Sequence, residues 1–244
     1  MYRAIEVAFP REWICPYWLW DQLIAVTRDE LCAYRMFRGH FDGDLEQFLL
    51  RPLRTFTILR DPVERTVSSY YYLRTHKRHP LYPLIAAQSL RDFCLHPVTT
   101  HMVKNYQAAY LARDFFRRDP RETWSRLVPG GTTEAPLQLL LELGMANVDE
   151  AELTHAACAA FEKLAAVGLT ERFVESIAHF NVVLGCALVP PSAPENVTPA
   201  RPPVSALDAE TLDVIRNLTR VDDLLYREAC KRFPPSYGAD EDSL

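Results

Sequence analysis

A strand that leads at once into a capped helix is the feature of this sequence that most constrains the fold. Residues 55–59 read Thr-Phe-Thr-Ile-Leu, a β-branched and apolar run that is typical of a buried strand. Asp61 is a helix-capping residue type, Pro62 suits the first helical position, and Glu64 completes the pattern of a capping box. The sequence therefore predicts a strand, then Arg60, then a capped helix.

Arg60 and Ser68 are the candidate anion ligands at this junction. Arg60 leaves the carboxyl end of the predicted strand, the edge where open α/β sheets bind ligands, and its planar guanidinium suits phosphate or sulfate. Ser68 lies two helical turns beyond Asp61 on about the same helix face, where its hydroxyl can donate to an anion held by Arg60. The alternative is structural: Asp61 caps the helix, Arg60 forms an ion pair, and Ser68 is merely tolerated.

The segment at 59–65, Leu-Arg-Asp-Pro-Val-Glu-Arg, carries a resemblance to a known family. Together with Ser68 and the three tyrosines at 70–72, it resembles the 3′-phosphate-binding segment of sulfotransferases that use 3′-phosphoadenosine 5′-phosphosulfate (PAPS). The similarity is to the branch that contains the heparan sulfate 2-O- and 6-O-sulfotransferases and their bacterial relatives. With the segments described next, the resemblance covers residues 11–233.

Three further segments support the resemblance. Residues 37–41 are similar to the Gly-His segment of the 2-O enzymes, and residues 195–202 are similar to the loop that closes over the nucleotide. Residues 105–107 are similar to a helix of the bacterial members. These members are expected to have an arginine soon after the position of Gln107, whereas this chain has Ala108.

The resemblance implies a set of site residues. In the related 2-O enzymes the histidine of the Gly-His segment accepts the proton of the acceptor hydroxyl, which makes His40 the candidate general base. The residues expected to bind the donor are Arg60, Ser68, Asn196, Thr198 and Arg201. No metal is expected, because sulfuryl transfer from this donor needs none. Without the family, His40 reads as a structural histidine and the 195–202 segment as an ordinary crossover loop.

One departure from the family is large. Such enzymes begin with a strand, a Lys-Thr-Gly-type loop and a helix, which hold the 5′-phosphosulfate on backbone N–H groups and a lysine. Here the first glycine is Gly39 and the first lysine is Lys77. The expected fold is α/β, a P-loop-NTPase-like sulfotransferase fold with a mostly parallel sheet flanked by helices and the first βα unit missing. An assigned start too far downstream, a truncated gene and genuine loss remain open as explanations.

The composition is that of a globular protein. With 244 residues, 48% of them hydrophobic and 24% charged, we expect a single domain at 1–233 and a disordered acidic tail at 234–244. A net charge of -5 argues against a nucleic-acid partner, and no apolar run of about eighteen residues predicts a membrane span. Six scattered cysteines read as buried thiols of a reducing compartment. Since the membrane anchor of the animal relatives is not seen, a bacterial cytoplasmic setting is expected.

Hydrophobic periodicity predicts the remaining elements by residue range. The expected helices are 18–25, 28–34, 102–118, 150–164, 173–184 and 208–233, and the further expected strands are 35–39 and 165–169. Thr170 is expected to cap the helix at 173–184. Residues 130–147 are expected to form a loop and a short helix in the acceptor region.

The expected function is transfer of a sulfuryl group from PAPS to a hydroxyl of a glycan or similar acceptor. The partners are then a small-molecule donor and a carbohydrate. Loss of the 5′-phosphosulfate loop costs orders of magnitude in rate, so the activity of this chain alone stays open. The alternative is a non-catalytic remnant that binds a nucleotide or an anionic glycan. The acceptor does not follow from the sequence, because acceptor grooves are formed by loops that vary between proteins. The oligomeric state does not follow from the sequence either.

Overall fold

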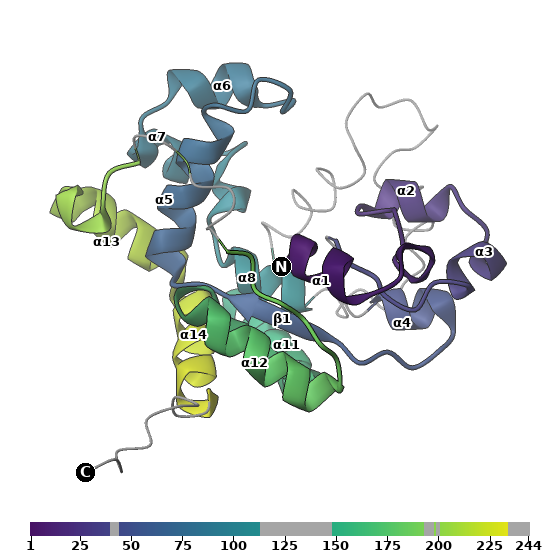
Figure 1. The fold of residues 1–244 in the computed structure, drawn as a ribbon. Coiled ribbons are helices and arrows are strands. Elements are labelled where there is room, and N and C mark those ends of the chain that lie inside the picture. Colours follow the sequence, from purple (N-terminus) through teal and green to yellow (C-terminus); the bar gives the residue numbers. More distant parts are fainter. Residues whose placement is uncertain (40–43, 113–147, 193–197, 199–200, 234–244) are drawn as a thin grey trace, which may run out of the picture.

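The computed structural model describes residues 1–39, 44–112, 148–192, 198 and 201–233 (Figure 1). Its helices are α1 (Tyr2–Ala8), α2 (Trp20–Ile24), α3 (Arg28–Cys32), α4 (Asp44–Leu49), α5 (Pro62–Leu73), α6 (Tyr82–Ala87), α7 (Leu90–Leu95), α8 (Tyr106–Leu111), α11 (Glu150–Lys163), α12 (Phe173–Leu184), α13 (Ala209–Leu218) and α14 (Arg220–Arg232). Short 3-10 turns lie at Arg11–Trp13, Thr100–Met102, Thr170–Arg172 and Val204–Ala206. The predicted acceptor region at 130–147 and the predicted tail at 234–244 lie outside the described residues.

Two parallel strands form the sheet of the described part of the chain. β1 (Phe56–Leu59) pairs with β2 (Ala166–Leu169) in a register that sets Phe56 opposite Ala166 and Leu59 opposite Leu169. Both strands agree with the prediction to within one residue at their starts. A helical chain around a small parallel sheet is compatible with the α/β class, whereas the complete sulfotransferase fold remains a prediction.

Helices cover both faces of this sheet. Phe56, Ile58 and Ala166 pack in one apolar cluster with side chains of α1 and α12. Leu59 and Leu169 pack in another cluster with side chains of α8, α11 and α14. Successive residues of a strand point to opposite faces of the sheet, so the even-numbered and odd-numbered strand residues pack in different clusters. The fold therefore has three layers, with helices on both sides of the sheet (Figure 1).

The strand predicted at 35–39 is wrong. Met36 makes one isolated parallel bridge with Ile14, and the backbone N–H groups of Arg35 and Met36 both donate to the Trp13 carbonyl at 2.9 Å. The Arg35 guanidinium lies 4.3 Å from the centre of the Trp13 ring. These contacts hold the segment in a single bridge that does not extend into a ladder.

Most predicted helices form, with small changes in their bounds. α11 and α12 match the prediction to within one residue, and α2 and α3 are shorter than predicted. The prediction that Thr170 caps α12 is wrong, because Arg172 is the N-cap and makes no side-chain bond there. The Thr170 hydroxyl instead donates to the Leu59 carbonyl at 3.2 Å, which ties the ends of β1 and β2 together.

Two predicted helices are corrected by a pair of reciprocal caps. The helix predicted at 102–118 begins only at Tyr106, because Asn105 has a left-handed backbone with φ of 44°. The helix predicted at 208–233 is split into α13 and α14 at Thr219.

The caps come from opposite helices. Oδ1 of Asn105 accepts the Val221 N–H of α14 at 3.0 Å, and Oδ1 of Asp222 accepts the Ala108 N–H of α8 at 2.7 Å. Each helix start therefore supplies the cap of the other, and both caps are buried. Such long-range partners are not visible in the periodicity of either segment.

Gly168 allows α12 to approach β2 closely. A Cβ atom at this position would lie 2.7 Å from Cβ of Ser176 and 2.8 Å from Cζ of Phe180, both on α12. Ser176 and Phe180 are fully buried, so neither can move away cheaply. The close approach of helix and strand therefore depends on the absence of a side chain.

We predict that Gly168→Ala lowers the free energy of unfolding by about 1–3 kcal/mol, because overpacking shifts the helix or forces strained rotamers. Urea unfolding followed by circular dichroism measures the change. Val182→Ala, at an exposed position of the same helix, is the control and should change stability by less than about 0.5 kcal/mol. An unchanged midpoint for Gly168→Ala would show that the contact is loose.

All six cysteines are free thiols. Cys15 and Cys94 are buried, and burial raises the pKa of Cys15 to about 11 and that of Cys94 to about 12. Cys32 and Cys230 are exposed and Cys158 and Cys186 are half-buried, so the expectation of six buried thiols is confirmed only for Cys15 and Cys94. In the described ranges, every helix is too short or too polar to cross a bilayer.

Candidate functional site: an arginine cluster at the end of β1

The junction between β1 and α5 forms as the sequence predicts. Asp61 is the N-cap of α5, and its side chain accepts the Glu64 backbone N–H at 2.9 Å. Pro62 takes the first helical position, where a backbone donor would have no helical partner. Arg60 stands between the strand and this cap. One guanidinium is therefore attached beside the N-terminus of a twelve-residue helix.

The second half of the predicted capping box is wrong. The backbone N–H of Asp61 donates to Oε1 of Glu171 at 3.1 Å and not to the Glu64 side chain. Glu171 follows β2, and the parallel pairing of the two strands brings it beside the end of β1. Because Glu171 satisfies this N–H, the carboxylate of Glu64 is left to interact with other groups.

Two arginines from distant parts of the chain meet at Glu64. Nη2 of Arg60 lies 3.4 Å from Oε2 of Glu64, and Nη2 of Arg201 donates to the same oxygen. Nε of Arg60 lies 3.9 Å from Oε1 of Glu171. The side chains of Arg60, Arg201 and Glu64 are 27%, 19% and 33% exposed. The structure thus brings two of the predicted donor ligands together around one anionic oxygen in a half-buried place.

Of the other predicted site residues, the structure describes Ser68 and Thr198, and neither contacts this cluster. Ser68 is half-buried on α5, and its hydroxyl forms no hydrogen bond with another described residue. Thr198 is also half-buried and forms no hydrogen bond with either arginine. His40 and Asn196 lie outside the described residues. The roles of these four residues remain predictions.

Glu171 is a site residue that the sequence prediction missed. It holds the Asp61 N–H, faces Arg60, and accepts the Tyr226 hydroxyl at 3.1 Å. Burial, followed by the charge of Glu171, raises the pKa of Tyr226. Glu171 stands just after the carboxyl end of β2, so the rule that singled out Arg60 could have found it as well.

Gln107 was recognised only as part of a similar segment, and its contact is new. The Arg60 N–H donates to Oε1 of Gln107, and Nε2 of Gln107 donates to the Arg60 carbonyl, both at 2.9 Å. This amide fixes the backbone at the end of β1, so that the Arg60 side chain leaves the strand in a defined direction.

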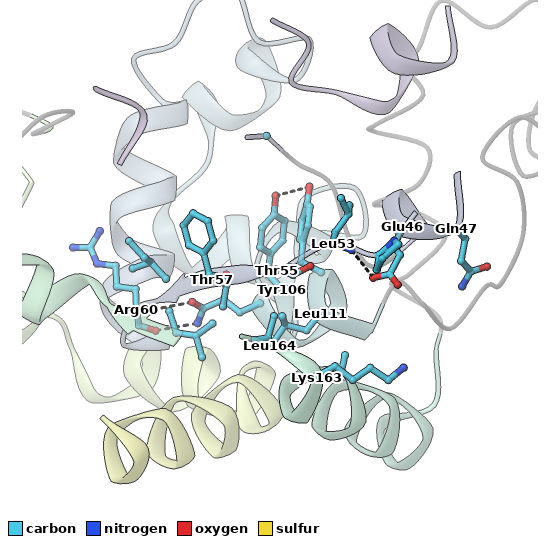
Figure 2. A pocket seen from close by; sticks show the side chains of 18 of the residues that line it. Glu46, Gln47, Leu53, Thr55, Thr57, Arg60, Tyr106, Leu111, Lys163 and Leu164 are labelled. Atoms are coloured by element: carbon cyan, nitrogen blue, oxygen red, sulfur yellow. Dashed lines mark hydrogen bonds between the residues drawn. The ribbon is translucent and has the colours of Figure 1, made fainter. Parts of the chain in front are cut away.

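A hollow of about 1010 Å³ borders β1 on the side of α4, α8 and α11. Figure 2 shows Tyr106, Leu111 and Leu164 around it, while the Arg60 side chain points away from Lys163. The backbone of Arg60 therefore borders the hollow, and its guanidinium belongs to the cluster with Glu64 and Arg201.

The two guanidinium groups of the arginine cluster face the carboxylates of Glu64 and Glu171, and groups of this kind can bind an anion. Guanidinium groups form paired hydrogen bonds to phosphate or sulfate oxygens, and the start of α5 adds the partial positive charge of a helix N-terminus. Glu64 supplies the anionic oxygen that both guanidinium groups face. In the described residues, no group of three His, Cys, Asp or Glu side chains is arranged to hold a metal ion.

Comparisons with protein-family models, with curated proteins and with solved structures found no match to this chain. The functional assignment therefore depends on the motif and on the geometry of the cluster.

Proposed function

We propose that this chain binds PAPS by its 3′-phosphate and transfers the sulfuryl group to a hydroxyl of a glycan or similar acceptor. The observation that carries the proposal is the convergence of Arg60 and Arg201 on one oxygen of Glu64. The two arginines were predicted to bind the same donor nucleotide from segments far apart in the sequence. Their meeting at one anion supports a shared ligand more strongly than either motif does alone.

In this proposal Glu64 holds the place of the phosphate. A phosphate carries more charge and more acceptor oxygens than a carboxylate, so it can bind both guanidiniums at once. Arg60 and Arg201 then exchange their bonds to Glu64 for bonds to the ligand, and the Ser68 hydroxyl donates from the next turns of α5. Asn196 and Thr198, from the same loop as Arg201, make the remaining contacts with the donor nucleotide.

His40 is proposed as the general base of the transfer. It accepts the proton of the acceptor hydroxyl as the oxygen forms a bond to sulfur, while the bond between sulfur and the bridging oxygen of the donor breaks. The electrons of the broken bond leave with 3′-phosphoadenosine 5′-phosphate (PAP). Arg60 and Arg201 contribute by orienting the nucleotide for in-line attack.

Calorimetric titration with PAP and with adenosine 5′-phosphate tests the binding part of the proposal. The second nucleotide lacks the 3′-phosphate, so it should bind at least about tenfold more weakly, the loss of one charged hydrogen-bonding group. Equal affinities would exclude a 3′-phosphate site. Labelled PAPS with a panel of glycans then tests transfer, and PAP binding without transfer would favour the alternative of a non-catalytic nucleotide-binding protein.

A further inference from the structure

The edge of β1 opposite β2 has a distinct set of backbone groups. On the β2 side, the carbonyl of Thr55 accepts from Ala165 N–H at 2.8 Å, and that of Leu59 accepts from Thr170. Successive residues of a strand direct their backbone groups to opposite edges. The N–H and C=O groups of Phe56 and Ile58 therefore point away from β2. In the described part of the chain, no hydrogen bond to these groups from that side is recorded.

The next residue on this edge already has a substitute for a strand. The side-chain amide of Gln107 gives one hydrogen bond to Arg60 and receives one from it, both at 2.9 Å. Two facing residues of antiparallel strands exchange the same pair of bonds. Gln107 thus occupies one residue position of a neighbouring strand, and the positions beside Phe56 and Ile58 continue in line from it.

The hollow beside β1 follows this edge. All residues from Thr55 to Arg60 line it, whereas a cavity over one face of a sheet would contact only alternate residues. Phe56, Thr57 and Ile58 are only half-buried, although their sequence is that of an internal strand. The space is therefore positioned along the outward donors and acceptors of Phe56 and Ile58, which have no partner among the described residues, and not over the side chains of one face.

The walls of the hollow limit what can enter. Leu53 lies on one wall, and Leu111 of α8 and Leu164, which directly follows α11, lie on the other (Figure 2). The β1 edge of a second copy would lie within a hollow of its own, so the two edges could not approach to the roughly 4.8 Å of paired strands. A single extended segment that protrudes from its own protein fits this shape.

The charge of the lining gives the chemistry of that segment. Among the described residues, the charged side chains that line the hollow, apart from Arg60 with its guanidinium in the cluster at Glu64, are three basic ones and one acidic one: Arg51, Arg65 and Lys163 against Glu46. A segment with alternating side chains would place apolar groups against the leucines and acidic groups near the basic side chains.

We propose that the edge of β1 is a strand-acceptor site, which binds an extended segment of a partner protein with alternating apolar and acidic residues. Main-chain hydrogen bonds to Phe56 and Ile58 give the affinity, as in other cases of strand addition. The lining of the hollow selects the side chains. This site uses the backbone of β1 and goes beyond the proposed nucleotide site, which uses the Arg60 side chain.

A synthetic peptide of about eight residues that alternates valine and glutamate is the probe, used with the full chain. The first control is a peptide that alternates valine and lysine. The other two controls are valine–glutamate peptides with N-methyl groups on alternate amides, so that each peptide has one of its two hydrogen-bonding edges blocked. We expect saturable binding of the unmodified glutamate peptide by fluorescence anisotropy, with at least roughly tenfold weaker binding of the lysine peptide. We also expect slower hydrogen exchange at the amides of Phe56 and Ile58.

Two variants separate edge pairing from general adsorption. Ile58→Pro removes one outward N–H and leaves the ladder to β2, and it should abolish binding. Lys163→Glu, at an exposed position, keeps the fold and should remove the preference for the glutamate peptide over the lysine peptide. No saturable binding at about 1 mM peptide, or equal binding of all N-methylated forms, would overturn the proposal. Dimerisation of the chain through protected Phe56 and Ile58 amides would overturn it too, in favour of a second copy.

Discussion

Replacing Arg60 with alanine should weaken PAP binding at least about 30-fold while leaving the fold intact. Truncating one member of a desolvated charge pair costs about 2–5 kcal/mol of binding free energy, and each 1.4 kcal/mol is tenfold in affinity. The cost to folding should stay below about 1 kcal/mol, because the ion pairs of Arg60 are half-exposed and screened. Calorimetry measures the affinity, and urea unfolding measures the stability.

Arg91→Ala is the matched control for this experiment. Arg91 also pairs with a carboxylate, Glu210 at 2.6 Å, but it does so on α7 and α13. The control removes the same charge from the protein and should leave PAP affinity within about twofold. If both variants lose affinity alike, net charge and not the cluster attracts the nucleotide. If Arg60→Ala binds like the parent, Arg60 is not a ligand.

Asp222→Asn should make the protein more stable near neutral pH and leave its stability almost unchanged near pH 4. Asp222 is fully buried, and burial raises its pKa to about 6 against the opposing effect of the Ala108 N–H bond and the Arg65 charge. Among the described residues, Oδ2 of Asp222 is buried without a hydrogen-bond partner. The ionised form is therefore disfavoured in the folded protein.

The sign of the pH dependence follows from the raised pKa. The unfolded-state pKa of an aspartate is about 3.9, so the advantage of the neutral side chain is complete below about pH 4 and is lost as pH rises through about 6. At neutral pH ionised Asp222 then costs roughly 3 kcal/mol, on the order of two pKa units. Asparagine keeps the Oδ1 acceptor for Ala108 and carries no charge, so it behaves as the neutral aspartate does.

Unfolding free energies of parent and Asp222→Asn, measured from about pH 4 to about pH 8, check this prediction. Their difference should grow in favour of the variant by roughly 3 kcal/mol over that range. Carboxylates with a lowered pKa, such as Asp208 beside the Thr211 N–H, also make stability depend on pH. Their effect is the same in parent and variant, so it cancels in the difference between the two unfolding free energies. If the unfolding free energies of the two proteins changed with pH in parallel, ionised Asp222 would not destabilise the folded protein. Asp222→Ala should lose stability even at pH 4, because the buried Ala108 N–H is then unpaired.

Local signals in the sequence were sufficient where the cause of the structure is local. The strand at 56–59, the Asp61 cap and the Pro62 start depend on residues within a few positions of each other, and all three form. The same holds for α11, whose N-cap Asp149 lies directly before it. These elements follow from propensity and capping alone.

The features that the sequence prediction missed depend on contacts between residues that are far apart in the sequence. Glu171 takes the N–H that the capping-box pattern assigns to Glu64, and it can do so only because β2 lies beside β1. The break of the predicted 208–233 helix depends on a cap from Asn105. Periodicity carries no information on such contacts, so these features could not be read from the sequence.

The candidate site was predictable in part for the same reason. Arg60 follows from the strand-end rule, and Arg201 was named through resemblance, but their meeting at Glu64 is a tertiary contact. Glu64 had been assigned to the helix cap alone. Its position between two guanidiniums gives the account its central claim, that a carboxylate occupies the place of the ligand phosphate.

A PAP titration of Glu64→Gln against the parent tests that claim most directly. Removing a like charge from the anion site should lower the Kd for PAP roughly tenfold, because two unit charges at about 4 Å interact by about 1–4 kcal/mol near a protein surface. Glu210→Gln, which frees Arg91 on another face, should leave the Kd unchanged. A lower Kd for Glu64→Gln alone is the result this account predicts. An unchanged or higher Kd would contradict it, because Glu64 would then be a structural ion-pair partner and not a substitute for the phosphate.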